Sequence, residues 1–250
     1  MDFEEVAGTV VERFATEIRA TVPLVSLWVH GSLAGGDFQF GRSDFDLLAV
    51  IAEKPGPEQV QGLETVHRDL IRDHPVAAKL HCSYMERHRL RDPGIEHLTW
   101  AFQEMFHRPV SPVIRSELLE IGATLYGPAP GGMIPPVPPA DLAAFVREEL
   151  DGYWRRVVAK FGPWLSDTWI DVGPLTLARA TVTLRGGGMI SKREAFPVLL
   201  ELGAPADLVS DIYDRRYGRP VRTSPGWRLR RARLARAFMA EGIDRALASA

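Results

Sequence analysis

The sequence predicts an α+β protein, in which an N-terminal α/β domain is followed by a C-terminal α-helical bundle. Over the first 90 residues, segments with apolar residues at helical spacing alternate with short apolar runs rich in β-formers. A proline- and glycine-rich stretch, GPAPGGMIPPVPP, then interrupts any regular structure. We therefore expect a first domain over residues 1–126, a linker over 127–140 and a helical domain over 141–250.

The first domain is predicted to run helix, strand, loop, strand, helix, strand. Apolar residues recur at helical spacing over 3–20 and 57–73. Short buried strands are predicted for 24–29, 45–51 and 76–84, with a Gly-rich loop over 31–43. The pattern over 95–125 predicts further helix, broken around its prolines. In the second half, helices are predicted from 141 and over 173–185, 191–202, 205–217 and 225–248.

Composition places the chain among globular proteins with no global charge bias. Of its 250 residues 46% are hydrophobic, and its formal net charge is −2, which disfavours a nucleic-acid partner. The one cysteine, Cys82, cannot form an intrachain disulfide, and the acidic N-terminus lacks the features of a signal peptide. No apolar run is long enough to span a membrane. We expect a cytoplasmic protein, with a monomer favoured.

The residues that carry chemistry lie in HGSLAGGDFQFGRSDFDLL, residues 30–48. Gly31 allows a ligand to approach the backbone closely, and its amide and Ser32 can donate to phosphate oxygens. Asp44 and Asp46 are two apart at a predicted strand, so both carboxylates point to one face. Such a pair repels unless a cation lies between, and Mg²⁺ prefers this oxygen-only environment. The combination predicts metal-assisted phosphoryl or nucleotidyl transfer.

This order of Gly-Ser, glycine-rich loop and Asp-x-Asp-Leu-Leu resembles the nucleotidyltransferase superfamily of DNA polymerase β. The resemblance extends to the segments LYGP at 125–128, PLTLARA at 174–180 and MISKREA at 189–195. These look like the aminoglycoside adenylyltransferases that act on streptomycin and spectinomycin. The resemblance implies an N-terminal nucleotidyltransferase domain and AMP transfer from ATP, with Mg²⁺, to a hydroxyl of a small molecule. An aminoglycoside is the acceptor that it implies, and antibiotic resistance the role.

The resemblance also implies roles for single residues. Ser32 and Ser43 match serines that contact the triphosphate, and Asp44 and Asp46 match the metal-binding aspartates. Three residues of the helical domain match nucleotide-binding positions: Arg179, Lys192 and Tyr217. For each of these three an ordinary structural role remains the alternative, as an ion pair, a solvated cation or a packed ring.

The chain departs from the family pattern at the general base, a carboxylate on the following strand. On the predicted strand 76–84 that position falls on Lys79, and no acid is present there. His81 shares a face with Lys79 by alternation and has the intrinsic pKa of a base near neutrality. Glu86, just beyond the predicted strand, is a further candidate. His81 and Lys79 are therefore the candidate catalytic residues, although His81 could equally be an ordinary strand histidine.

Three functions stay open. The first is the adenylyltransferase, and the second is a nucleotide-binding protein of the same fold whose catalysis is lost or altered, which Lys79 favours. The third is a nucleotidyltransferase directed at protein or RNA, which the absence of basic excess disfavours. Aromatic and acidic residues of the helical domain would suit a polycationic sugar, although a helix core with exposed acids explains them equally well: Trp154, Trp164, Asp167, Trp169 and Asp171.

Overall fold

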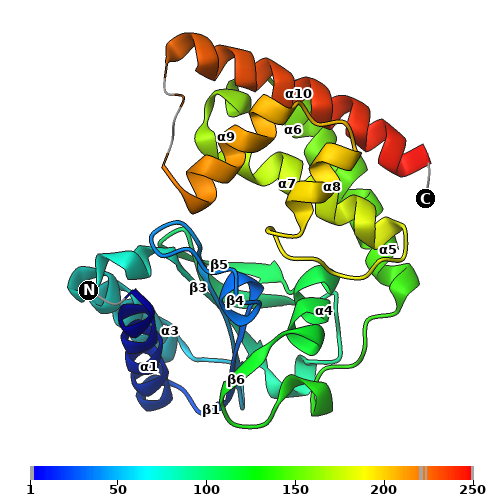
Figure 1. Ribbon diagram of the computed structural model, residues 1–250. Coiled ribbons are helices and arrows are strands. Elements are labelled where there is room, and N and C mark those ends of the chain that lie inside the picture. The colour runs from blue at the N-terminus through cyan, green and yellow to red at the C-terminus, as the bar shows by residue number, and fades with distance from the viewer. Residues whose placement is uncertain (1–2, 220–221, 223, 249–250) are drawn as a thin grey trace. The chain divides into compact units, whose positions relative to one another are not determined.

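The computed structural model describes residues 3–219, 222 and 224–248. The chain divides into two compact units, residues 1–137 and 138–250 (Figure 1). The first unit holds one mixed sheet with helices, and the second is helical, which confirms the predicted α+β class. No helix in the described part of the chain is long and apolar enough to cross a membrane.

The first unit is built on a six-stranded sheet of order β5-β4-β3-β2-β1-β6. Only β2 and β3 run parallel; the other neighbours are antiparallel. The strands are β1 (Leu24–His30), β2 (Phe45–Ile51), β3 (Leu80–Glu86), β4 (Glu96–Ala101), β5 (Glu104–Pro109) and β6 (Ala123–Tyr126). The parallel register pairs Asp46 with His81, so these two residues lie side by side.

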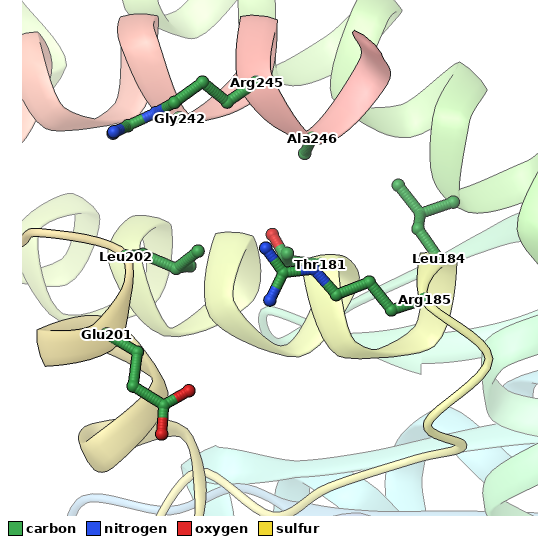
Figure 2. A pocket seen from close by; sticks show the side chains of 8 residues that line it. All are labelled: Thr181, Leu184, Arg185, Glu201, Leu202, Gly242, Arg245 and Ala246. Carbon is green, nitrogen blue, oxygen red and sulfur yellow. The ribbon is translucent and has the colours of Figure 1, made fainter. Parts of the chain in front are cut away.

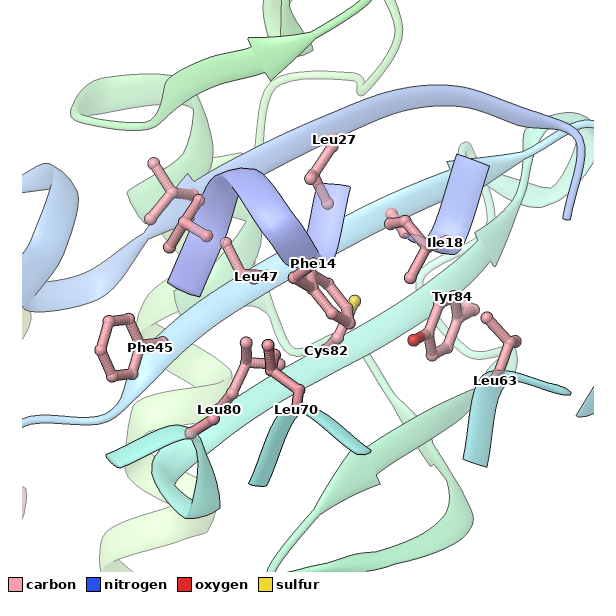
Figure 3. Packing of buried hydrophobic residues seen from close by; sticks show 14 of the residues in the cluster. Phe14, Ile18, Leu27, Phe45, Leu47, Leu63, Leu70, Leu80, Cys82 and Tyr84 are labelled. Atoms are coloured by element: carbon pink, nitrogen blue, oxygen red, sulfur yellow. The ribbon is translucent and has the colours of Figure 1, made fainter. Parts of the chain in front are cut away.

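One face of the sheet packs on α1 (Phe3–Thr21) and α3 (Pro57–Asp73). Alternate residues of β2 and β3, such as Leu47 and Cys82, point into this core (Figure 3). Within it the His67 ring, 1% exposed, bonds the Tyr84 hydroxyl at 2.7 Å and stacks on Trp100. The regularly spaced apolar residues of the sequence therefore lie on the core-facing side of these elements.

The opposite face packs around α4 (Pro112–Glu120), where Trp28, Leu48 and Val50 are buried. The proline-rich segment also lies against this unit. The Ser26 hydroxyl and the Trp28 indole both donate to the Pro128 carbonyl, at 3.0 and 2.8 Å. Residues 127–137, which begin the predicted linker, thus belong to the first compact unit.

The structure corrects the predicted secondary structure in two places. Residues 95–125 are not mainly helical: they form the β4–β5 hairpin, α4 and β6. The hairpin turns at Phe102 and Gln103, which both have positive φ. Gly or Asn usually occupies such positions, and neither is present here to indicate the turn in the sequence. Residues 76–79, predicted to begin the strand 76–84, instead lie in a short 3₁₀ helix, η1 (Pro75–Lys79), so Lys79 lies outside the strand. Pro75 stands at the first position of this helix, where its fixed φ is favourable.

The second unit contains only helices among the residues described. They are α5 (Pro139–Glu149), the π-helical η4 (Leu150–Trp154), α6 (Arg155–Ala159), η5 (Gly162–Leu165), α7 (Asp167–Leu184), α8 (Ala195–Glu201), α9 (Ala206–Tyr217) and α10 (Pro225–Ala248). Gly242 lets α10 approach α7 closely, since a Cβ there would lie 2.3 Å from Leu177 Cδ2. Close helix packing thus explains the Gly in this long helix.

Candidate functional site

Gly31 sits directly against the carboxylate of Asp46. Gly31 follows β1 and begins the four-residue helix α2 (Gly31–Ala34), with φ at +64°. A Cβ at this position would lie 2.6 Å from Asp46 Oδ2. The antiparallel register, which pairs His30 with Asp46, creates this approach. Only glycine satisfies both the backbone angle and the space, so the predicted phosphate turn and one predicted metal ligand are neighbours.

The two aspartates stand at the beginning of β2. Asp44 lies one residue before the strand and Asp46 is its second residue. Asp46 points to the same side of the sheet as Leu48 and Val50, the side on which α4 packs. The side chains of Asp44 and Asp46 are 44% and 31% exposed, so a ligand can reach both carboxylates. The strand supplies the rigid backbone that holds them two residues apart.

Lys79 lies beside Asp44. The ammonium donates to the Arg42 carbonyl at 3.0 Å and lies 3.4 Å from Asp44 Oδ1. The lysine is the last residue of η1, immediately before β3. This positive charge lies at the carboxylate that is predicted to bind a metal ion, so a dication bound there would compete with Lys79 for it.

His81 lies beside Asp46 on the parallel neighbour strand, with its Nδ1 3.7 Å from Asp46 Oδ1. Its side chain is 14% exposed and its ring contacts Phe102 of the hairpin turn at 5.1 Å between centroids. Glu86, in contrast, is not a loop residue: it ends β3, is buried, and pairs with Ile51 at the far end of β2. Of the side chains on β3, His81 is the one that adjoins the aspartates.

The two candidate serines differ in surroundings. Ser32 lies in α2 and is partly exposed. Ser43 is 3% exposed, and its hydroxyl accepts a hydrogen bond from the Gln39 amide at 2.9 Å. As an acceptor in that bond, the hydroxyl keeps its own hydrogen for donation. Ser43 thus shapes the 39–43 loop next to Asp44, besides any contact with a ligand.

Two buried groups near this turn escaped the sequence analysis. The His30 ring and the Glu117 carboxylate lie 3.2 Å apart, Nδ1 to Oε2, and both side chains are 10% exposed. Their contact anchors the end of β1, just before Gly31, to α4. The signal was weak: His30 adjoins the Gly-Ser motif, but Glu117 lies in a segment with no recognisable motif. Only the packing of α4 on the sheet joins them.

The three candidates of the helical unit gather around one loop of that unit, residues 185–194. Arg179 on α7 donates from Nε to the Ile190 carbonyl at 2.7 Å, two residues before Lys192. Arg193 on the same loop stacks over the Tyr217 ring at 4.3 Å. Arg179, Lys192 and Tyr217 are thus brought to one region of the helical unit. Arg179, for which the resemblance implies a phosphate contact, therefore also holds this loop in place.

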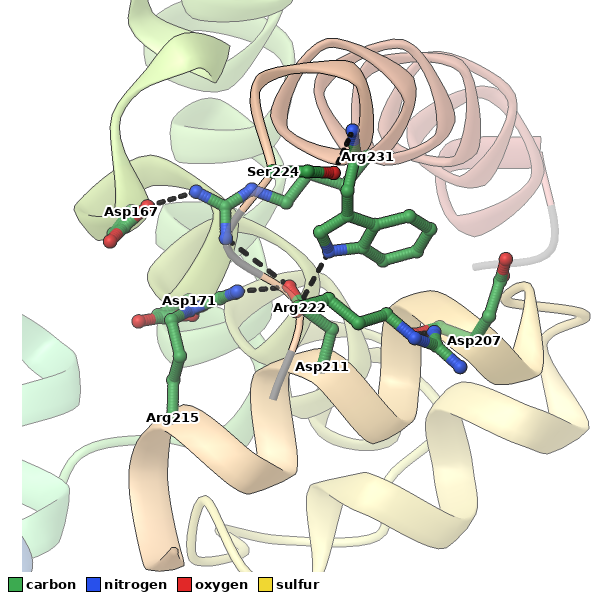
Figure 4. Close-up of polar contacts among 9 residues, drawn as sticks. Asp167, Asp171, Asp207, Asp211, Arg215, Arg222, Ser224 and Arg231 are labelled. Atoms are coloured by element: carbon green, nitrogen blue, oxygen red, sulfur yellow. Dashed lines mark hydrogen bonds and ion pairs between the residues drawn. The ribbon is translucent and has the colours of Figure 1, made fainter. Parts of the chain in front are cut away.

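The acids proposed for a cationic acceptor are neutralised by arginines inside the helical unit (Figure 4). Arg215 pairs with Asp171 at 2.5 Å, and Arg231 pairs with Asp167. Both arginines also pair with the buried Asp211. Burial raises the pKa of Asp171, and its bonds to Arg215 oppose that rise. These acids serve the fold.

The tryptophans of the same group are also largely structural. Trp164 is fully buried and Trp154 is 5% exposed. Trp169 packs edge-on against Trp154, with ring centroids 6.0 Å apart. These indoles therefore form part of the helix core, which is the alternative role that the sequence left open for them.

A pocket of about 240 Å³ lies among α7, α8 and α10 of the helical unit (Figure 2). Its lining includes Thr181, Arg185 and Glu201. None of the residues assigned to nucleotide, metal or catalysis lines it. The pocket is therefore separate from the candidate site.

The donor set fits a hard dication that is shared with a ligand. Asp44 and Asp46 supply carboxylate oxygens, and no group of three His, Cys, Asp or Glu residues in the described chain could hold a metal by itself. Mg²⁺ commonly takes one or two carboxylates and completes its shell with water and phosphate oxygens. The residues present therefore fit Mg²⁺ bound together with a nucleotide better than a dedicated protein-only metal site.

No protein-family model matches the sequence, and no curated protein resembles it significantly. The fold does have a solved counterpart. A spectinomycin adenyltransferase, AAD(9), from Enterococcus faecialis, crystallised with ATP and spectinomycin, superposes with a TM-score of 0.70. The match covers 93% of this chain and 98% of that one, at 13% sequence identity. The chain has a nucleotidyltransferase-like fold. At this identity the similarity establishes the fold alone.

Proposed function

We propose that this protein is an ATP- and Mg²⁺-dependent nucleotidyltransferase that transfers AMP to a hydroxyl of a small molecule. The observation that carries the proposal is the approach of Gly31 to Asp46, because it puts the Gly31-Ser32 turn beside one of the two aspartates. The shared fold with an adenyltransferase crystallised with ATP supports it.

In this proposal the nucleotide phosphates bind at the Gly31 amide, with the Ser32 and Ser43 hydroxyls as further donors. Asp44 and Asp46 hold Mg²⁺, which when bound would neutralise charge on the triphosphate. Arg179 and Lys192 add positive charge to the phosphates, and Tyr217 packs near the nucleotide. Their gathering around the 185–194 loop supports a common role for them.

The reaction forms one P–O bond and breaks another. The acceptor hydroxyl oxygen attacks the α-phosphorus, pyrophosphate leaves, and the hydroxyl proton must be removed. His81 is the proposed base, because it is the β3 side chain beside Asp46 and a neutral imidazole can take that proton. The acceptors named by the resemblance and by the fold neighbour, streptomycin and spectinomycin, are the first compounds to test.

The second candidate function is nucleotide binding without turnover. The Lys79 ammonium beside Asp44 favours it, since this charge opposes a metal ion at the same carboxylate. The position of His81 favours the enzyme. Because both functions require nucleotide binding, only the detection of a product separates them.

The deciding experiment incubates the protein with Mg²⁺, ATP and a panel of hydroxyl-bearing compounds, and detects transfer as a mass increase of one AMP group. The enzyme predicts a product with at least one acceptor, lost in Asp46→Asn. Mg²⁺-dependent ATP binding without any product would support the binding protein. The absence of ATP binding would refute both.

A further inference from the structure

We infer that the acceptor side of this site binds an anionic group, such as a phosphate or a carboxylate, through Arg108. The inference rests on the proposed function and narrows its acceptor class, away from the polycationic aminoglycosides. Three features carry it: the side of the sheet on which Arg108 lies, the direction of its side chain, and the absence of a hydrogen bond or ion pair to it from the described residues.

Arg108 lies on the same face of the sheet as Asp46. Met105 of β5 packs into the core on the α1–α3 side, so Phe106 and Arg108 point to the opposite side. The register confirms this assignment. Phe106 pairs with Thr99, whose hydroxyl bonds Ser83 at 3.0 Å, and Ser83 follows His81 by two residues on β3. A continuous face therefore runs from Asp46 to Arg108.

The guanidinium leans along this face toward the aspartates. Its carbon lies over the Phe106 ring, 5.8 Å from the centroid, which is the direction of the hairpin turn and of His81. Burial lowers the pKa of Arg108, while the charge of Asp46 raises it, so the two charges are within electrostatic range. The other charged β5 residue on this side, Glu104, is exposed at the turn and screened by water.

Arg108 is half-buried and makes no hydrogen bond or ion pair with any residue that the structure describes. Its Nε is fully buried without a partner, and so are both ring nitrogens of His97, the residue paired with it on β4. An unsatisfied buried donor destabilises the fold, and a charged one does so more strongly. A bound anion would satisfy the guanidinium, as carboxylate and phosphate oxygens accept its paired donors.

Strand order indicates that this anion belongs to the acceptor. Gly31 and Ser32 follow β1, on one side of β2, while β3, β4 and β5 lie on the other. A nucleotide whose phosphates bind at the Gly31 turn leaves the β3–β5 side for the acceptor, next to His81. Among the described residues of β3, β4 and β5, the acceptor there meets Arg108 and, apart from Glu104, no acid close to His81. Lys79, just before β3, adds a second positive charge beside Asp44. A polycation would be repelled by Arg108.

The first test uses inorganic phosphate as a probe, so that it does not depend on finding an acceptor. Phosphate is titrated calorimetrically into the full chain saturated with Mg²⁺ and a non-hydrolysable ATP analogue, or with Mg²⁺ alone if the analogue does not bind. Phosphate should bind the wild type and bind Arg108→Gln about tenfold more weakly or worse. Arg108→Lys should restore part of the affinity, and Arg91→Gln, an exposed control, should match the wild type. Equal phosphate binding by wild type and Arg108→Gln, or none by the wild type, overturns the inference.

The second test separates an acceptor anion from the nucleotide. Affinity for Mg²⁺ and the ATP analogue should be unchanged, within twofold, in Arg108→Gln. A tenfold loss of that affinity would assign Arg108 to the nucleotide and overturn the acceptor assignment. Transfer should favour glycerol 3-phosphate over glycerol, and Arg108→Gln should abolish that preference. Failure of transfer to every compound would count against the proposed function, while the phosphate titration would still judge Arg108.

Discussion

The imidazole of His81 and the carboxylate of Asp46 lie side by side on parallel strands, with 3.7 Å between Nδ1 and Oδ1. If His81 is the base, His81→Ala should reduce transfer at least about tenfold, because a general base contributes roughly 10²–10⁴-fold. ATP affinity should stay the same, since the imidazole is assigned no contact with the nucleotide. His88→Ala, a largely exposed histidine after β3, is the control. Unchanged turnover in His81→Ala would show that another group takes the proton.

Gly31→Ala should abolish Mg²⁺-dependent ATP binding. The new methyl group meets Asp46 Oδ2 at 2.6 Å, and the residue is forced to keep a φ of +64°. Gly36→Ala provides the matched control, because its φ is +67° but its Cβ would meet nothing within 4 Å. Both variants should lose about 1 kcal/mol of folding free energy for the backbone angle. Only Gly31→Ala should lose the ligand, and equal ATP affinity in the two would contradict the close approach.

Lys79→Met should make the site bind Mg²⁺ more tightly. The ammonium lies 3.4 Å from Asp44 Oδ1 and is partly exposed, so the pair is worth about 0.2–1 kcal/mol. Removal of this competitor should lower the Mg²⁺ concentration for half-maximal ATP binding by up to about fivefold. Lys54→Met, an exposed control, should leave it unchanged. A higher Mg²⁺ requirement in Lys79→Met would mean that the lysine helps to hold the phosphates.

His67 makes the first unit sensitive to acid. Burial lowers its pKa from 6.5 to about 3, so the folded chain keeps it neutral while the unfolded chain is protonated below pH 6.5. Stability is therefore lost as the pH falls from 6.5 toward 3, by about 1.4 kcal/mol per pH unit from this group. Urea unfolding should show a shallower acid loss in His67→Gln than in the wild type. Some loss of stability in acid should remain in His67→Gln, because burial also lowers the pKa of His97 to about 4. Identical slopes would contradict a neutral buried His67.

The sequence was sufficient to predict the backbone geometry of those parts of the candidate site that are local in the chain. The Gly31-Ser32 turn and the Asp44–Asp46 spacing lie within one loop and one strand start, where glycine geometry and alternation are reliable guides. The α+β class followed from periodicity, since α1 and α3 bury a regular apolar stripe.

The remaining features depend on strand register and tertiary packing. That His81, rather than Lys79, adjoins Asp46 is set by the β2–β3 pairing, which no local pattern encodes. Arg108 and Glu117 lie in the segment 95–125, whose apolar pattern predicts helix although part of it forms the β4–β5 hairpin. The arginine partner of Asp171 lies on α9, 44 residues away, and that of Asp167 lies on α10, 64 residues away.

The most direct test of the central claim is the calorimetric affinity for ATP with and without Mg²⁺, in the wild type and in Asp46→Asn. Neutralising one carboxylate removes half of the charge that the protein offers a hard dication. The wild type should bind ATP at least about tenfold more tightly with Mg²⁺, and Asp46→Asn should lose that difference. The exposed control Asp141→Asn should keep it. Mg²⁺-dependent ATP binding that is unchanged in Asp46→Asn would contradict the assignment of this site.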